Sequence, residues 1–218
     1  MSRRLTRKDS QEITRARLRQ SATWAFAHHG IAGARIEAIA EAAGYSRGAF
    51  YSNYKTKLEL LVDLLRDKQA SEIARWREVL LEGTDAEESL TQLTARYNDL
   101  PDARERAMLN GELQLQAERN EAFRPIYEEY IDGILTEVRG LFELMFKRHG
   151  RKVPENLDVL LITTRQLGLG LSTPIILGRQ IAAQFTPEQI LFEFLIDLMK
   201  RSPPDDEAAL ATSSATSG

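Results

Sequence analysis

The stretch Ala43–Lys57, AGYSRGAFYSNYKTK, decides the fold prediction because its composition differs from that of the rest of the chain. It contains two glycines, four aromatic residues and three cations in fifteen positions. Ala40, just before it, is small enough to let a following helix cross closely, and Gly44 can adopt the positive φ of a tight turn. Phe50 supplies an apolar side chain that can fix the angle between two helices. This spacing predicts a helix-turn-helix.

The second helix of this motif has two distinct sides. Phe50 and Tyr54 are four residues apart, so they share one side and are expected to pack on the preceding helices. Arg47 and Tyr51 share the adjacent side. In a helix-turn-helix the second helix lies in the major groove of DNA, where Arg47 can reach a guanine edge or a phosphate. Gly48 permits close approach of the backbone, and the Tyr51 hydroxyl can donate to a phosphate oxygen.

The charge distribution supports an interaction with a polyanion at the N-terminal end. Residues 1–57 hold eleven Lys and Arg against four acidic residues, a net charge of +7. The remaining residues hold 18 basic and 28 acidic side chains, a net charge of −10, which gives −3 for the whole chain. A basic end beside an acidic remainder is typical of a nucleic-acid-binding segment joined to a domain of another purpose.

The chain as a whole shows 3.6-residue apolar periodicity and little of the alternation typical of strands, which predicts an all-α fold of about nine helices. Capping patterns mark two of the starts, at Thr56–Glu59 and at Thr186–Gln189. Gly30 and Gly44 mark helix ends. The expected helices are 10–28, 36–43, 46–53, 56–82, 86–99, 103–118, 121–149, 155–178 and 187–201.

Four segments follow from these elements. Residues 1–9 are expected to be a basic flexible arm, and residues 10–56 a helix-turn-helix domain. Residues 57–201 are expected to form a larger helical domain. Residues 202–218, SPPDDEAALATSSATSG, have few large apolar side chains and are predicted to be disordered.

Residues 12–61 resemble the DNA-binding domain of TetR-family transcriptional repressors. The resemblance rests on residues 38–61, AIAEAAGYSRGAFYSNYKTKLELL, with their Ile-Ala, Ala-Gly, Ser-basic-Gly and Lys-x-x-Leu elements and their aromatic-rich helix. It covers about a quarter of the chain. It implies a homodimer that binds a pseudo-palindromic DNA operator, and a helical C-terminal domain that dimerises and binds a small molecule. The implied function is a repressor released from DNA by a small, moderately apolar ligand.

The resemblance also implies which residues contact DNA. Ala34-Arg35 stands where the family usually has Ser or Thr before the second helix, so a phosphate contact there would come from Arg35. Ala49 replaces a frequent Thr and Asn53 a frequent His, so the operator sequence does not follow from a relative. The implied DNA-binding residues are Arg35, Ser46 as helix cap, Arg47, Gly48, Tyr51, Asn53 and Lys57.

The C-terminal candidates follow from the same resemblance and from helical spacing. A mixture of aromatic and polar side chains suits a moderately apolar ligand, and a/d-like apolar spacing suits a four-helix dimer interface. The ligand candidates are Trp76, Tyr97, Met108, Leu109, Glu112, Leu113, Gln116, Phe123, Tyr127 and Tyr130. The dimer candidates are Leu160, Leu161, Thr164, Leu167, Gly168, Leu171, Ile190, Phe194 and Leu198.

Other classes of protein fit the sequence less well. The chain has no cysteine, and its histidines lack metal-ligand spacing, so we expect neither catalysis nor a cofactor nor a metal. The apolar residues 157–178 carry Asp158 and Arg165, which argues against a membrane span. An N-terminus without an apolar run predicts a cytoplasmic protein. A DNA-binding protein without a ligand, acting in chromosome architecture or controlled by a protein partner, stays an open alternative.

Overall fold

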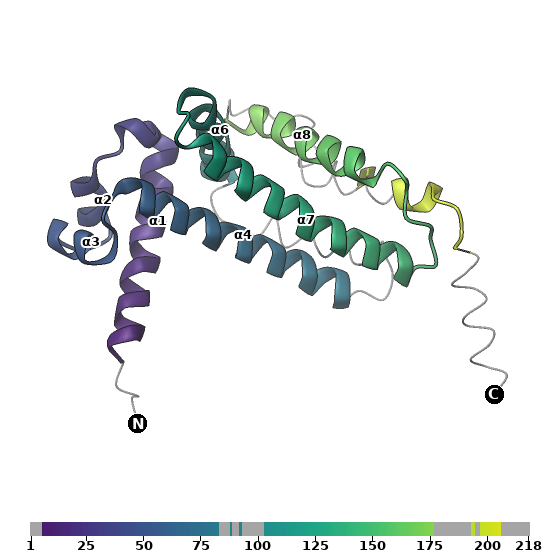
Figure 1. Ribbon diagram of the computed structural model, residues 1–218, viewed down its shortest axis with the longest axis horizontal. Coiled ribbons are helices and arrows are strands. Elements are labelled where there is room, and N and C mark those ends of the chain that lie inside the picture. Colours follow the sequence, from purple (N-terminus) through teal and green to yellow (C-terminus); the bar gives the residue numbers. More distant parts are fainter. Residues whose placement is uncertain are drawn as a thin grey trace. The chain divides into compact units, whose positions relative to one another are not determined.

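The structure is a computed structural model that describes residues 6–82, 88, 92, 103–176, 193–194 and 197–205. Apart from an isolated β-bridge between Arg151 and Pro204, regular structure in these residues is helical, which confirms the all-α prediction (Figure 1). None of the described helices is long and apolar enough to cross a membrane. The helices are α1 (Arg7–Gly33), α2 (Ile36–Ala42), α3 (Arg47–Asn53), α4 (Lys57–Glu82), α6 (Ala103–Arg119), α7 (Arg124–Arg148) and α8 (Leu157–Ile176).

Helices α1 and α7 begin at other residues than predicted, and each start has a local cause. Helix α1 begins at Arg7 rather than at residue 10, because Thr6 and Asp9 form a capping box in which each side chain accepts the other's backbone N–H. Helix α7 begins at Arg124 rather than at residue 121, because the Asn120 side chain accepts from the backbone N–H groups of two following residues. Most of the expected helices 86–99 and 187–201 lie outside the described residues; within them, residues 88, 92, 193–194 and 197–201 are described and are helical.

Contacts divide the chain into two compact units. The first comprises Met1–Gln69 and Arg104–Tyr130, and the second Ala70–Ala103 and Ile131–Gly218. The first unit therefore includes α6 and the first turns of α4 in addition to the helix-turn-helix. Helix α4 runs unbroken through residue 69, so no turn or break in the sequence marks this division.

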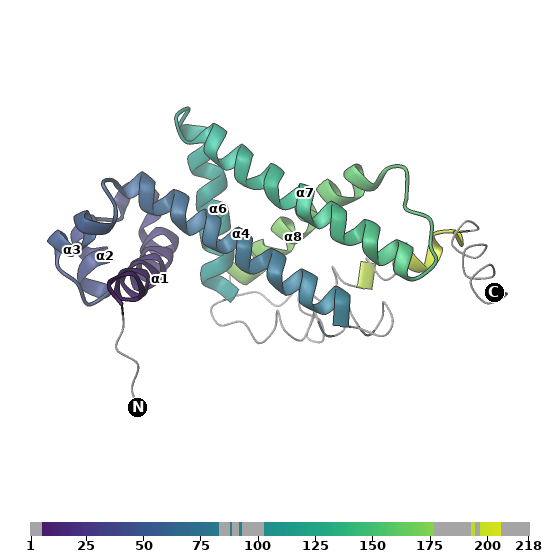
Figure 2. The ribbon, with the colours of Figure 1, turned by 60° about the horizontal axis from the view of Figure 1, so that its bottom comes forward.

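The first unit has its core where α1, α2 and α3 meet (Figures 1 and 2). Ile39, Ala40 and Phe50 are completely buried there. Gly44 forms the turn with φ +79°, and its neighbour Tyr45 donates its N–H to the Ala40 carbonyl at 2.8 Å. A residue with a side chain would be strained at that φ. The predicted roles of Ala40, Gly44 and Phe50 in the helix-turn-helix are thus present.

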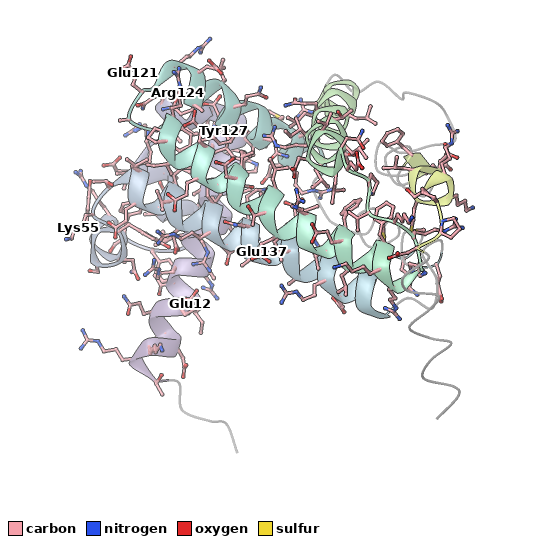
Figure 3. The ribbon with its side chains drawn as sticks, turned by 45° about the vertical axis from the view of Figure 1, so that its right-hand side comes forward. Glu12, Lys55, Glu121, Arg124, Tyr127 and Glu137 are labelled. Atoms are coloured by element: carbon pink, nitrogen blue, oxygen red, sulfur yellow. The ribbon has the colours of Figure 1, made fainter. Side chains whose placement is uncertain are left out.

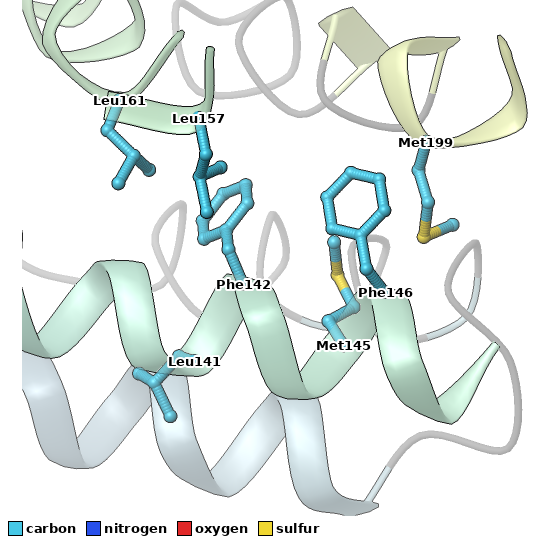
Figure 4. Close-up of a cluster of buried hydrophobic side chains, with 7 residues drawn as sticks. All are labelled: Leu141, Phe142, Met145, Phe146, Leu157, Leu161 and Met199. Carbon is cyan, nitrogen blue, oxygen red and sulfur yellow. The ribbon is translucent and has the colours of Figure 1, made fainter. Parts of the chain in front are cut away.

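The second unit has an apolar core with aromatic and sulfur-containing side chains. Phe142, Met145 and Phe146 of α7 extend toward Leu157 of α8 and toward Met199 (Figure 4). Leu141 and Leu161 complete the buried cluster. None of these seven side chains carries a nitrogen or an oxygen atom, so the burial of apolar surface and close packing hold this cluster together.

Candidate nucleic-acid interface

The two sides of α3 differ as their spacing predicts. Phe50 and Tyr54 are buried, whereas Arg47 and Tyr51 are exposed, with 64% of the Arg47 side chain and 44% of Tyr51 accessible to solvent. Ser46 caps the helix by accepting the Ala49 N–H at 3.2 Å. The N-terminal turn of α3 therefore presents a cation and a phenol on one side of a fixed helix.

Two contacts hold the Arg47 side chain on the exposed side of α3. Its guanidinium lies 5.5 Å from the centre of the Tyr51 ring, and its Nη1 pairs with Glu37 of α2 at 3.0 Å. Both partners of the ion pair are largely exposed, so the pair is weak and can exchange for a phosphate or a base. The ring below the guanidinium limits the directions in which Arg47 can turn.

Further cations extend this surface along the chain. Arg35 is exposed at the N-cap of α2 and makes no side-chain cap, in keeping with the missing Ser or Thr at this point. Lys55 is exposed after α3 and was not among the residues that the sequence predicted to contact DNA. Its position between Tyr54 and Lys57, directly after the recognition helix, could have indicated it. Arg35, Arg47 and Lys55 give the helix-turn-helix three exposed positive charges.

Two residues that were expected to contact DNA have side chains that bond to backbone carbonyls of the protein. The Asn53 amide donates to the Ala49 carbonyl at 2.8 Å, and its oxygen is buried. The Lys57 ammonium donates to the carbonyls of Ala32 and Ala34 at 3.1 and 2.9 Å, and burial lowers the pKa of this lysine. Both side chains thus bond to the protein itself.

Behind α3, a polar network fixes the helix against α1 and α4. The Tyr54 hydroxyl donates to Asp63 Oδ2 at 2.6 Å, and Arg15 and Arg19 pair with the same carboxylate at 3.0 and 2.9 Å. Arg15 also lies 4.9 Å from the Tyr54 ring centre. Arg19 further pairs with Glu12, which is labelled on α1 in Figure 3, at 3.0 Å. Asp63 therefore joins three helices through one carboxylate.

The pKa values in this network follow from burial and from charge. Burial, together with the hydrogen bond to Asp63, raises the pKa of Tyr54 to about 12. Burial alone would raise the pKa of Asp63, but the hydrogen bonds from Tyr54 and Arg19 and the two guanidinium charges outweigh it and lower that pKa. Asp63 is therefore ionised and Tyr54 protonated at neutral pH.

Comparisons with known proteins agree with this geometry. Residues 18–64 match the model of the bacterial regulatory proteins of the tetR family. The HTH-type transcriptional repressor SCO4008 of Streptomyces coelicolor is 44% identical over 57 residues, which cover 26% of this chain and 30% of that protein. The fatty acid metabolism regulator protein of Bacillus subtilis is 27% identical over 118 residues, 51% of this chain and 60% of that protein. The matches thus span less than two thirds of either relative.

Solved structures extend the similarity of fold to most of the chain. A TetR-family transcriptional regulator from a Rhodococcus species superposes with a TM-score of 0.71 at 22% identity, covering 86% of this chain and 99% of that one. Residues 18–64 thus carry the segment that defines the tetR family, and most of the chain has a fold similar to that of this solved structure. Among the described residues, no group of three or more His, Cys, Asp or Glu could hold a metal ion.

The ligand candidates of this chain lie in different environments. Leu109, Leu113, Phe123 and Tyr130 are buried, and Met108, Glu112, Gln116 and Tyr127 are half-buried. Tyr127, labelled at the start of α7 in Figure 3, lies 6.2 Å between ring centres from both Phe123 and Tyr130. The Trp76 side chain and Tyr97 lie outside the described residues. The Glu112 carboxylate accepts the backbone N–H of Ile31 at 2.7 Å.

The dimer candidates divide between core and surface. Leu161 and Thr164 are buried within the subunit, Leu160, Leu167, Gly168 and Leu198 are half-buried, and Phe194 is exposed; the Leu171 side chain and Ile190 lie outside the described residues. The apolar surface of α8 instead includes Val159 and Ile162, which are 60% and 50% exposed. Their exposure did not follow from the sequence, because α8 is apolar on more than one side and periodicity does not tell which side faces the core.

Proposed function

We propose that this chain is a homodimeric repressor that binds a pseudo-palindromic operator through the exposed side of α3. The observation that carries the proposal is the pair Arg47 and Tyr51, exposed on a helix whose other side is fixed by Phe50 and Tyr54. An arginine at the start of a recognition helix can bind a guanine edge with two hydrogen bonds or a phosphate with one. The exposed Arg35 and Lys55 supply the contacts to the DNA backbone that set its register.

Dimerisation is part of the proposal because one short helix contacts only one half-site. Two copies of α3 related by a twofold axis would contact half-sites about one helical turn apart. Val159 and Ile162 support an interface on α8, since two large aliphatic side chains a turn apart are exposed there. They replace Leu161 and Thr164 as the centre of the proposed interface.

The proposed effector is a small, moderately apolar molecule that lowers operator affinity. The transcriptional regulator FadR from Bacillus subtilis, similar in fold with a TM-score of 0.64 at 20% identity, was solved with stearoyl-CoA. A regulator from Saccharomonospora viridis, with a TM-score of 0.63, was solved with choline. These two ligands support binding of a small molecule by this fold, and the buried Leu109, Leu113 and Phe123 favour an effector with an apolar part.

Selection of genomic DNA tests the proposed function. The purified protein is mixed with fragmented genomic DNA at near-physiological salt, and the bound fragments are sequenced. A pseudo-palindrome with half-sites about 10 base pairs apart, or slightly more, is the expected result. If no sequence is enriched and DNA binding is sensitive only to salt, the proposal of a sequence-specific repressor is contradicted. That result would favour an architectural DNA-binding protein.

A thermal-shift screen tests the effector separately. A cognate ligand stabilises the protein by RT ln(1 + [L]/Kd), so its melting temperature rises with ligand concentration. The same compound must lower the affinity of the protein for the operator. By linkage, the operator must lower the affinity for the compound by the same factor. A compound that stabilises the protein and leaves operator affinity unchanged would contradict release by that ligand.

A further inference from the structure

The end of α1 is interrupted immediately before the helix-turn-helix. Gly30 has non-helical dihedral angles, φ 72° and ψ 159°, within the span of α1. The four residues that follow, 31–34, form a single turn that we call the junction turn. It is closed by a hydrogen bond from the Ala34 N–H to the Gly30 carbonyl at 3.0 Å. Arg35, the next residue, is the N-cap of α2, so the position of the junction turn sets where α2 begins.

Helix α6 contacts the first residue of this turn. Glu112 Oε1 accepts the Ile31 N–H at 2.7 Å, across 81 positions of sequence and within the same compact unit. The Glu112 carboxylate is also close to Gly30: a Cβ added to this glycine would lie 3.1 Å from Oε1. Positive φ and the nearby carboxylate both favour glycine at position 30. The break in α1 thus leaves room for a carboxylate to reach the backbone.

Helix α4 contacts the other end of the same turn. The Lys57 ammonium donates to the carbonyls of Ala32 and Ala34, so an anion from α6 binds the first N–H and a cation from α4 binds the last carbonyls. Opposite charges at the two ends of a helical turn match the direction of its peptide dipoles. The covalent chain alone leaves this turn free to rotate about Gly30, and these two side chains fix it together with the burial of Ile31 and Ala34.

We propose that Glu112 is a positioning residue for DNA binding: by accepting the Ile31 N–H it fixes the junction turn, and through it α2 and the Arg47 partner Glu37, in the orientation that α3 needs. The proposal rests on the proposed function, since it concerns affinity for an operator. It assigns α6 a direct role in the DNA-binding unit and removes Glu112 from the ligand candidates. A hydrogen bond to a charged acceptor is strong enough for its loss to be measured.

The test compares three variants on an operator selected with the wild-type protein. E112A removes the acceptor and is expected to lower operator affinity about fivefold or more. E112Q keeps an oxygen that can accept the Ile31 N–H and is expected to remain within about twofold of wild type. E118A removes another carboxylate from α6, one that is 75% exposed, and is expected to leave affinity unchanged.

Hydrogen exchange of the Ile31 amide provides a local measurement. E112A should speed exchange at Ile31, and E112Q should restore most of its protection, with unchanged helix content in both. If E112A melts below the assay temperature, E112L fills the same space without an acceptor and should show the same loss of affinity. Wild-type affinity in E112A or E112L, or an E112Q defect as large as that of E112A, would overturn the proposal.

The controls separate this inference from the proposed function. If the wild-type protein selects an operator and R47A loses it while the Glu112 variants bind normally, only the role of Glu112 is wrong. If the wild-type protein selects no sequence, the proposed function itself is wrong and the Glu112 proposal falls with it.

Discussion

The two units of this chain differ in the polar contacts that accompany their apolar cores. In the first unit, Phe26, Ile39 and Phe50 are completely buried, and single polar atoms fix the helices further: Asp63 joins α1, α4 and Tyr54, and Ser46 caps α3. In the second unit, the buried cluster around Phe142 and Phe146 contains only apolar side chains. A polar network tolerates little change of geometry, whereas an apolar core tolerates exchanges that conserve volume. The first unit, which contains α3, is therefore expected to tolerate fewer substitutions in its polar network than the second unit tolerates in its apolar cluster. The match to the tetR family model, residues 18–64, lies in the first unit.

The largest expected effect concerns the surface of the second unit. Ile162→Asp puts a charge in the middle of the proposed dimer interface, where burying it would cost several kcal/mol. The variant should be a monomer and should lose about a hundredfold or more in operator affinity, because the two half-sites are then bound independently. Analytical ultracentrifugation and an operator titration measure both effects.

The control for this variant is Gln114→Asp, which adds the same charge to an exposed position of α6. It should remain a dimer. An Ile162→Asp protein that also stays dimeric at micromolar concentration would show that the exposed apolar side of α8 is not the interface.

The next largest effect should come from the polar network. Asp63→Asn keeps the shape of the side chain but removes the charge that pairs with Arg15 and Arg19, at an expected cost of about 2–3 kcal/mol in the free energy of unfolding. The pKa of Asp63 is lowered in the folded state, so its stabilising effect is complete above its unfolded pKa of about 4 and is lost as pH falls through the folded value.

Urea denaturation of both proteins from pH 3 to pH 7 measures this effect. The difference in free energy of unfolding between wild type and Asp63→Asn should be constant above about pH 5 and should shrink below pH 4. A difference that grows on acidification would mean that the sign of the Asp63 pKa shift is wrong.

The smallest effect tests the tolerance of the apolar core. Met145 is buried among Phe142, Phe146 and Leu157. Met145→Leu conserves volume and apolar character and is expected to change the free energy of unfolding by less than about 1.5 kcal/mol. If this substitution destabilises the protein more than Asp63→Asn, the contrast between the two units does not hold.

The features that could be predicted from sequence depend on residues close together along the chain. The turn at Gly44, the Ser46 cap and the two sides of α3 all follow from spacings of three to six residues, and the structure has them. The capping box of Thr6 and Asp9 has the same short spacing and was also within reach, although the prediction placed the helix start at residue 10.

The features that could not be predicted involve contacts across long stretches of sequence. Lys57 bonds to carbonyls 23 and 25 residues away, and Glu112 to an amide 81 residues away. Local spacing carries no information about such partners, so the sequence predicted neither of these contacts. On α8 the limit is different: Leu161 and Ile162 are adjacent and equally apolar, and only the packed structure shows which of them is buried.

Operator affinity of Arg47→Ala, beside wild type, tests the central claim that the exposed side of α3 binds DNA. Fluorescence anisotropy is measured on the selected operator and on unrelated DNA, with circular dichroism and dimer mass as checks. We expect about a tenfold loss or more on the operator, a much smaller loss on unrelated DNA and an unchanged fold, because a guanine contact is lost in each subunit. Equal affinity of the folded, dimeric variant and wild type for the operator would contradict it.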